Sequence, residues 1–157
     1  MKMRKHYVVA VFMSVLGSCS KESVAPLDVA EKKNIAEVEQ QLLKTVNEHR
    51  VSKGLNVLEF NSVAYEHANA HTDYMIALGA INHDNFKVRA SEISARTDAE
   101  FVAENVAKDY TTASEAFQGW LNSTNHKRTM EGDFTHTAVS VKKDADGNRY
   151  YTQIFFR

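Results

Sequence analysis

The chain has 157 residues, of which 43% are hydrophobic and 25% charged, and its formal net charge at pH 7 is −1. These values are typical of one globular domain with an adequate core. A charge this close to zero gives no basic field, so nucleic acid is not expected as a partner. No segment combines the length and apolarity needed for a mature helix that spans a bilayer.

Residues 1–18 have the pattern of a bacterial lipoprotein signal peptide. Positive side chains precede an apolar run at 7–16, and two small residues then lead into Cys19. Small side chains fit the signal peptidase, and the thiol accepts a diacylglycerol. The pattern predicts cleavage before Cys19, lipidation of its thiol and attachment to the outer membrane. An ordinary secretory leader and a short buried helix are the alternative interpretations.

A tether is expected between the lipid anchor and the folded domain. Residues 19–30 are polar, contain the only proline and show no hydrophobic periodicity. Residues 20–22 are similar to surface-export signals of some Bacteroidetes lipoproteins, which would place the protein on the cell surface. The domain itself is expected at 31–157. Because Cys19 is the only cysteine, no intramolecular disulfide can form and the core alone must stabilise the fold.

Two amphipathic helices are predicted at the start of the domain. Residues 31–52 and 61–78 carry apolar side chains at three- and four-residue spacings. Asn61 or Ser62 is the expected N-cap of the second helix, and Gly79 its end. One face of this helix carries Ala64, Ala68, His71 and Met75.

Two histidines of the second helix have the spacing of a metal-binding pair. His67 and His71 are four residues apart, but no third ligand is obvious on the helix. This favours the alternative in which one imidazole is exposed and the other packs in the core. A short helix is predicted next, over residues 86–95.

The last third of the chain changes from helical to strand periodicity. Residues 112–123 open with a capping box and carry the only tryptophan, Trp120, which is predicted to be largely buried. Residues 135–143 and 149–156 alternate in the manner of strands, and Asp146-Gly147 between them predicts a β-hairpin. Helices followed by a hairpin favour an α+β fold, an α/β/α sandwich with a small, mainly antiparallel central sheet.

Over about residues 38–157 the chain resembles the CAP superfamily, which comprises cysteine-rich secretory proteins, antigen 5 and plant pathogenesis-related proteins. It is most similar to the bacterial, SCP-like branch. The matching residues are Asn47-x-His49-Arg50, Gly54-Leu55 with Leu58, Ala64 to Met75, Gly79 with His83, Glu104-Asn105-Val106-Ala107, Trp120 with Ser123 and His126, and Tyr151-x-Gln153-x-Phe155. The resemblance implies an α/β/α sandwich, in agreement with the hydrophobic patterns.

The resemblance also implies a polar cleft. The family's central cavity commonly holds two His and two Glu; His83 matches the first His and Glu104 the first Glu. His126 stands where bacterial members usually carry a His, and Asn105, next to Glu104 in the sequence, is expected in the same cleft.

Four positions depart from the family pattern. Ser123 stands where animal and plant members have a second Glu, and Tyr150 where they have a His. Ala103 replaces the usual Gly before Glu-Asn, and Thr129 replaces an Asn that is common in bacterial members.

Three kinds of chemistry are open to such a cleft. His83, Glu104 and His126 would suit Zn²⁺ or another divalent metal with one open position. An imidazole–carboxylate pair could act as a general base, and Ser123, three residues before His126, would be its nucleophile. No oxyanion hole or nucleophile elbow can be recognised in the sequence. The third possibility is a buried polar network that fixes the loops to one another.

Three functions follow from these alternatives. The first is a non-enzymatic binding module, tethered to the envelope or the surface, for a lipid, an envelope glycan or a protein. The second is a weak hydrolase of peptide or ester bonds that uses Ser123, His126 and Glu104. The third is a structural envelope protein. The resemblance favours the first, because CAP domains often bind lipids or partners.

Overall fold

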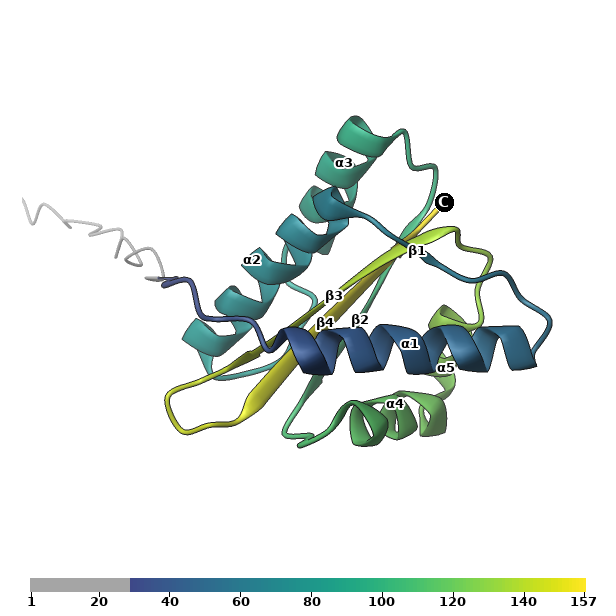
Figure 1. Cartoon of the computed structure of the whole chain (residues 1–157). Helices are drawn as coiled ribbons and strands as arrows, with labels where there is room; N and C mark the ends of the chain where they lie inside the picture. The colour runs from purple at the N-terminus through teal and green to yellow at the C-terminus, as the bar shows by residue number, and fades with distance from the viewer. Residues whose placement is uncertain (1–28) are drawn as a thin grey trace, which may run out of the picture.

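The computed structural model describes residues 29–157 (Figure 1). The predicted signal peptide at 1–18, the predicted lipidation site Cys19 and nearly all of the expected tether at 19–30 lie outside the described residues. Within the described part, no helix has the length and apolarity to cross a membrane.

Five helices and four strands make up the described residues. In chain order they are α1 (Ala36–Ser52), β1 (Glu59–Phe60), α2 (Ser62–Leu78), α3 (Phe86–Thr97), β2 (Val102–Lys108), α4 (Ala113–Asn122), α5 (Thr124–Met130), β3 (His136–Lys143) and β4 (Arg149–Phe156). The predicted hairpin is β3–β4, and the predicted capping box of α4, formed by Thr112 and Glu115, is present. Asn61 is the N-cap of α2 and Gly79, with a φ of 74°, its C-cap.

The four strands form one sheet in the order β1-β3-β4-β2. β1 runs parallel to β3, and the other two pairings are antiparallel. The α1 and α4 helices pack on one face of this sheet, and α2 and α3 on the other (Figure 1). This arrangement confirms the predicted α/β/α sandwich with a mainly antiparallel sheet.

The edge strand β2 sends neighbouring side chains to opposite faces of the sheet, because side chains alternate along a strand. Ala103 and Ala107 pack in the core under α1 and α4, whereas Val106 packs against Met75 of α2. The same alternation separates Glu104 from Asn105. Glu104 faces α2 and α3, and Asn105 faces α4 and α5.

The structure differs from the expected elements at several places. The first helix begins at Ala36 rather than at residue 31, because Asn34 bridges to Lys142 and the Ile35 N–H donates to Val141 O (2.8 Å). The third helix runs two residues beyond the expected 86–95. The short α5 helix was not predicted, because Met130 is its only buried residue and it therefore has no apolar periodicity.

Candidate functional site

A buried carboxylate on β2 forms the centre of the candidate site. The Glu104 side chain is 1% exposed. Its Oε1 accepts from His83 Nδ1 (2.8 Å) and from Arg89 Nη2 (2.8 Å), and its Oε2 accepts from Arg89 Nε (3.0 Å). The Arg89 guanidinium therefore binds the Glu104 carboxylate in a bidentate manner, through two parallel hydrogen bonds, which is the strongest pairing available to the two groups.

Two elements bring these partners to Glu104. His83 lies in the loop between α2 and α3, and Arg89 lies on α3. Arg89 Nη1 also donates to Asp84 O (2.6 Å), so one guanidinium ties the loop to the strand. The His83 imidazole is half exposed, which makes it the accessible member of the cluster.

A second imidazole approaches Glu104 from α2. His71 Nε2 lies 2.9 Å from Asn82 O and 3.7 Å from Glu104 Oε1, and the ring is buried. Burial lowers the pKa of His71 more than the Glu104 charge raises it, so the ring is neutral at pH 7. Its Nε2 then donates to the Asn82 carbonyl and fixes the loop that carries His83.

The charge balance keeps Glu104 ionised. Burial raises the pKa of the carboxyl, but the hydrogen bonds from His83 and Arg89, with the nearby positive charges, outweigh it and leave the pKa below its ordinary value. At neutral pH the cluster is thus a buried carboxylate held by a guanidinium.

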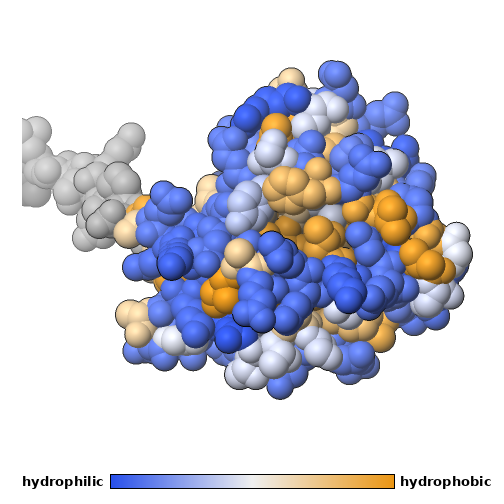
Figure 2. All heavy atoms as spheres, in the orientation of Figure 1, coloured by the Kyte–Doolittle hydropathy of each residue, from blue (hydrophilic) through white to orange (hydrophobic). Residues whose placement is uncertain are grey.

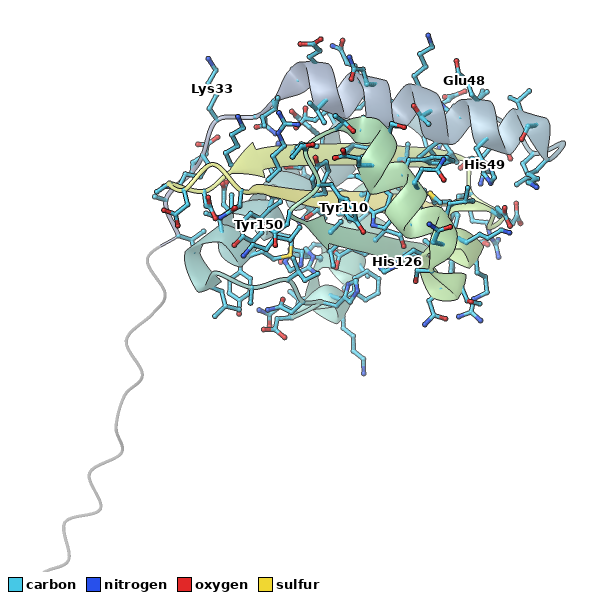
Figure 3. All side chains as sticks on the ribbon, turned by 90° about the horizontal axis from the view of Figure 1, so that it is seen from below. Lys33, Glu48, His49, Tyr110, His126 and Tyr150 are labelled. Carbon is cyan, nitrogen blue, oxygen red and sulfur yellow. The ribbon has the colours of Figure 1, made fainter. Side chains whose placement is uncertain are left out.

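His126 lies on the other side of β2. Figure 3 shows it on α5, next to the edge of the sheet. Its Nδ1 is 2.8 Å from Ser123 Oγ, and its carbonyl accepts from Asn105 Nδ2 (3.1 Å). Burial lowers the pKa of the His126 imidazole, and the electrostatic effect of His83 lowers it further.

The predicted site residues therefore form two groups. His83 and Glu104 are in direct contact, and Ser123, His126 and Asn105 form the second group. Within residues 29–157 no hydrogen bond joins Glu104 to His126, so Ser123, His126 and Glu104 do not form a continuous serine–histidine–carboxylate chain. Asn105 reaches His126 through the backbone and not through the imidazole.

The cluster as arranged does not fit a divalent metal. Among the described residues, no group of three or more His, Cys, Asp or Glu side chains is placed to hold an ion. Both oxygens of Glu104 already accept hydrogen bonds from Arg89, whose positive charge would also repel a cation. The guanidinium neutralises the carboxylate where a metal would otherwise do so.

Sequence reasoning missed Arg89 and the role of His71. Arg89 is buried although it lies on a short polar helix, and its four-residue spacing from the buried Ile93 was the available signal of an inward-facing position. His71 packs in the core, as expected for one of the two histidines on α2. The other histidine, His67, is not exposed as expected: only 13% of its side chain is exposed, and its Nδ1 lies 3.6 Å from Glu92 Oε2.

Comparison with known proteins agrees with the fold. Residues 43–155 match the model of the family described as "CAP: Cysteine-rich secretory protein family". The chain is 32% identical over 125 residues to the uncharacterized membrane protein YlbC of Bacillus subtilis (strain 168), covering 76% of this chain but 34% of that protein. It thus spans about a third of the length of this curated relative.

Solved structures show the same architecture. An outer surface protein from Borrelia burgdorferi superposes with a TM-score of 0.72 at 20% identity, over 80% of this chain and 96% of that one. An extracellular protein containing a SCP domain from Bacillus anthracis str. Ames gives a TM-score of 0.67 at 25% identity, over 78% and 41% of the two chains.

Proposed function

Because this chain belongs to the cysteine-rich secretory protein (CAP) family, we propose that it is an envelope- or surface-tethered binding module whose ligand is a lipid, an envelope glycan or a protein. The observation that supports binding over catalysis is the state of Glu104. Its two oxygens accept three hydrogen bonds from His83 and Arg89, so it is neither a free base nor a free metal ligand.

A general base works best with a pKa near the operating pH and a free lone pair toward the substrate. Glu104 has a lowered pKa and lies under the surface, so its role is to hold the α2–α3 loop in place. The half-exposed His83 above it and the half-buried His126 across the strand are the polar groups that a ligand can reach. The site thus presents two imidazoles on a rigid support, an arrangement that suits the binding of a ligand.

Native mass spectrometry of the mature protein, extracted without chelator in a mild detergent, tests the binding function. We expect a non-covalent mass above that of the chain, and a loss of this mass in His83→Ala. His136→Ala is the matched control, since this histidine lies on β3, away from Glu104, and has a partly exposed side chain. A wild-type spectrum that holds only the chain would contradict the proposal.

Export and tethering form a separate part of the proposal. The relatives include an outer surface protein and an extracellular protein, which supports export. A triacylated Cys19 would supply more than one acyl chain, enough for stable attachment to an outer membrane. We expect Cys19→Ser to move the protein from the membrane fraction to the soluble fraction. If the Cys19→Ser variant stays in the membrane fraction, the proposed lipid anchor at Cys19 is wrong.

One contact favours the hydrolase alternative. Ser123 Oγ and His126 Nδ1 are 2.8 Å apart, and the lowered pKa of His126 makes it a neutral acceptor at pH 7. The pair spans the first turn of α5 and lacks Glu104 as its third member. We therefore expect no substantial hydrolysis of generic ester or peptide substrates. Turnover that disappears in Ser123→Ala and survives in His136→Ala would favour the hydrolase instead.

A further inference from the structure

Two side-chain oxygens in the core lack a hydrogen-bond donor, and they belong to residues that lie opposite each other. Among residues 29–157, neither Asn105 Oδ1 nor Gln153 Oε1 has a partner, although both atoms are buried. Asn105 on β2 is the register partner of Gln153 on β4, so the two side chains lie on the same face of the sheet. The Cβ atoms of such a pair are about 4.5–5.5 Å apart. The two acceptors without donors are therefore close neighbours.

The hydrogen bonds of the two amide nitrogens fix the orientation of both amides. Asn105 Nδ2 donates to His126 O (3.1 Å), so the reversed amide would place two oxygens against each other. Gln153 Nε2 donates to Thr137 Oγ1 (3.1 Å), and the Thr137 hydroxyl donates its own hydrogen to Ile154 O (2.7 Å). The hydroxyl can therefore only accept from Gln153. Turning either amide around would not supply a donor to its oxygen.

Neither amide reaches the surface. The face of the protein shown in Figure 2 is largely hydrophilic, but Asn105 is only 1% exposed and Gln153 0%. A buried acceptor that has lost its water without gaining a donor lowers the stability of the fold, so a donor is expected inside the core. Ala103 and Ala107 precede and follow Asn105 on the same face of β2, and their methyl side chains leave room beside the amide.

We propose that one internal water molecule lies between Asn105 and Gln153 and donates one hydrogen to each amide oxygen. A water molecule has two hydrogens, and two polar partners are enough to hold it in a protein interior. A metal cation would need more oxygen ligands than these two, and it would keep its charge beside apolar neighbours such as Val139 and Phe155.

This water molecule would also help to position α5. The amide that it holds on β2 donates to the carbonyl of His126, in the first half of the helix. At the other end of α5, Met130 is the only buried residue, and Arg50 Nη1 donates to its carbonyl (2.8 Å). The first half of α5 therefore depends on Asn105. The hydration site does not depend on the ligand-binding role proposed for His126, because it follows from hydrogen bonds in the core alone.

The first measurement is the NOE between water and the side-chain amide hydrogens of the full chain in a mild detergent. A long-lived internal water molecule gives an NOE of opposite sign to that of fast-exchanging surface water. We expect the NOE of a long-lived water molecule at Asn105 Nδ2 and at Gln153 Nε2, because each nitrogen shares an amide group with an oxygen that the water contacts. Asn47 is the matched control without such an NOE, because Leu58 already pairs with both ends of its amide.

The second measurement repeats the first in Gln153→Met, which keeps the length of the side chain but removes the acceptor. We expect the water NOE at Asn105 to disappear and the amide hydrogen of Lys127, in the first turn of α5, to exchange at least about threefold faster. The Glu131 amide, at the end of this helix, should change less. Gln41→Met, at an exposed position of α1, is the control variant and should leave the NOE and both exchange rates unchanged.

Three results would overturn the hydration site. The first is the absence of a long-lived water NOE at both amides of the unaltered chain. The second is a scalar coupling across a hydrogen bond from Gln153 Nε2 to Asn105 Oδ1, which would mean that the two amides pair directly. The third is a water NOE at Asn105 that persists in Gln153→Met. The first two need no variant, so they decide the question even if Gln153→Met does not fold. An unchanged Lys127 exchange rate in a folded Gln153→Met variant would overturn the positioning of α5.

Discussion

Arg89→Met should lower the free energy of unfolding by about 3–5 kcal/mol, the cost typical of removing one partner from a buried ion pair. The Glu104 side chain is 1% exposed and the Arg89 side chain 10%. Methionine keeps much of the apolar volume of the arginine stem but supplies no donors. Glu104 would then remain buried with His83 as its remaining side-chain hydrogen-bond donor, and the loop at Asp84 would lose its bond to the guanidinium. Denaturant unfolding at pH 7 measures the loss.

Two further variants separate the ion pair from the helix. Arg96→Met changes an exposed arginine of the same helix, whose partner Glu66 is also exposed, and should cost no more than about 1 kcal/mol. The double variant Arg89→Met/Glu104→Leu removes both charges and should recover much of the stability lost in Arg89→Met. If the single Arg89 variant costs less than about 1 kcal/mol, water reaches Glu104 and the cluster is not the dry network described above.

The same ion pair sets a pH dependence. The pKa of Glu104 is lower in the folded protein than its ordinary value, because the hydrogen bonds from His83 and Arg89 outweigh burial. The stabilisation from ionised Glu104 is therefore fully present above the ordinary pKa and is lost as pH falls through the lower folded value. In Arg89→Met the opposing effect of burial gains weight, so this loss should begin at a higher pH. Unfolding curves at several acidic pH values report the difference.

Local patterns predicted most of the fold, since each of the main helices and the β3–β4 hairpin has its own periodicity and end signals. The strand β1 could not be predicted, because it has only two residues and forms only by pairing with the edge of β3. Family resemblance supplied the pairing of His83 with Glu104, which no local pattern contains. It did not supply Arg89, the residue that changes the chemistry of the cleft, because the partner of a buried carboxylate depends on which helix crosses the strand.

The separation of Glu104 from Asn105 shows a limit of a different kind. The two are neighbours in the sequence and were expected in one cleft. Once residues 102–108 form a strand, alternation must send them to opposite faces, and each then recruits partners from a different layer. His83 and His126 lie on opposite sides of β2, and the outer edge of this strand is the place where the two sides of the sheet meet. Whether the His83 and His126 groups form one site therefore depends on the position of β2 at the edge of the sheet. That position follows from the strand order, which cannot be derived from a local stretch of sequence.

Trp120→Ala should cost about 3–5 kcal/mol, through lost transfer free energy and the cavity left in the core. The prediction that Trp120 is buried is confirmed, since the residue is 1% exposed and packs with Ala116 and Phe117 of α4. Its Nε1 also donates to Val106 O (3.1 Å), so the ring links α4 to the edge strand that carries Glu104. Denaturant melts at pH 7 give the free energy, and Phe101→Ala, at an exposed position before β2, is the surface control.

A second variant divides this effect into packing and hydrogen bonding. Trp120→Phe keeps most of the apolar contact but leaves the Val106 carbonyl without the indole N–H, and should cost about 1–3 kcal/mol. A loss below about 1 kcal/mol in Trp120→Ala would contradict the buried position, because truncation of a buried tryptophan costs more than this. Because Val106 lies two residues from Glu104 on the same face of β2, the loss of its anchor should also loosen the carboxylate. Amide exchange at residues 104–106 should then rise in both Trp120 variants, while exchange along β3 and β4, in the middle of the sheet, should rise less.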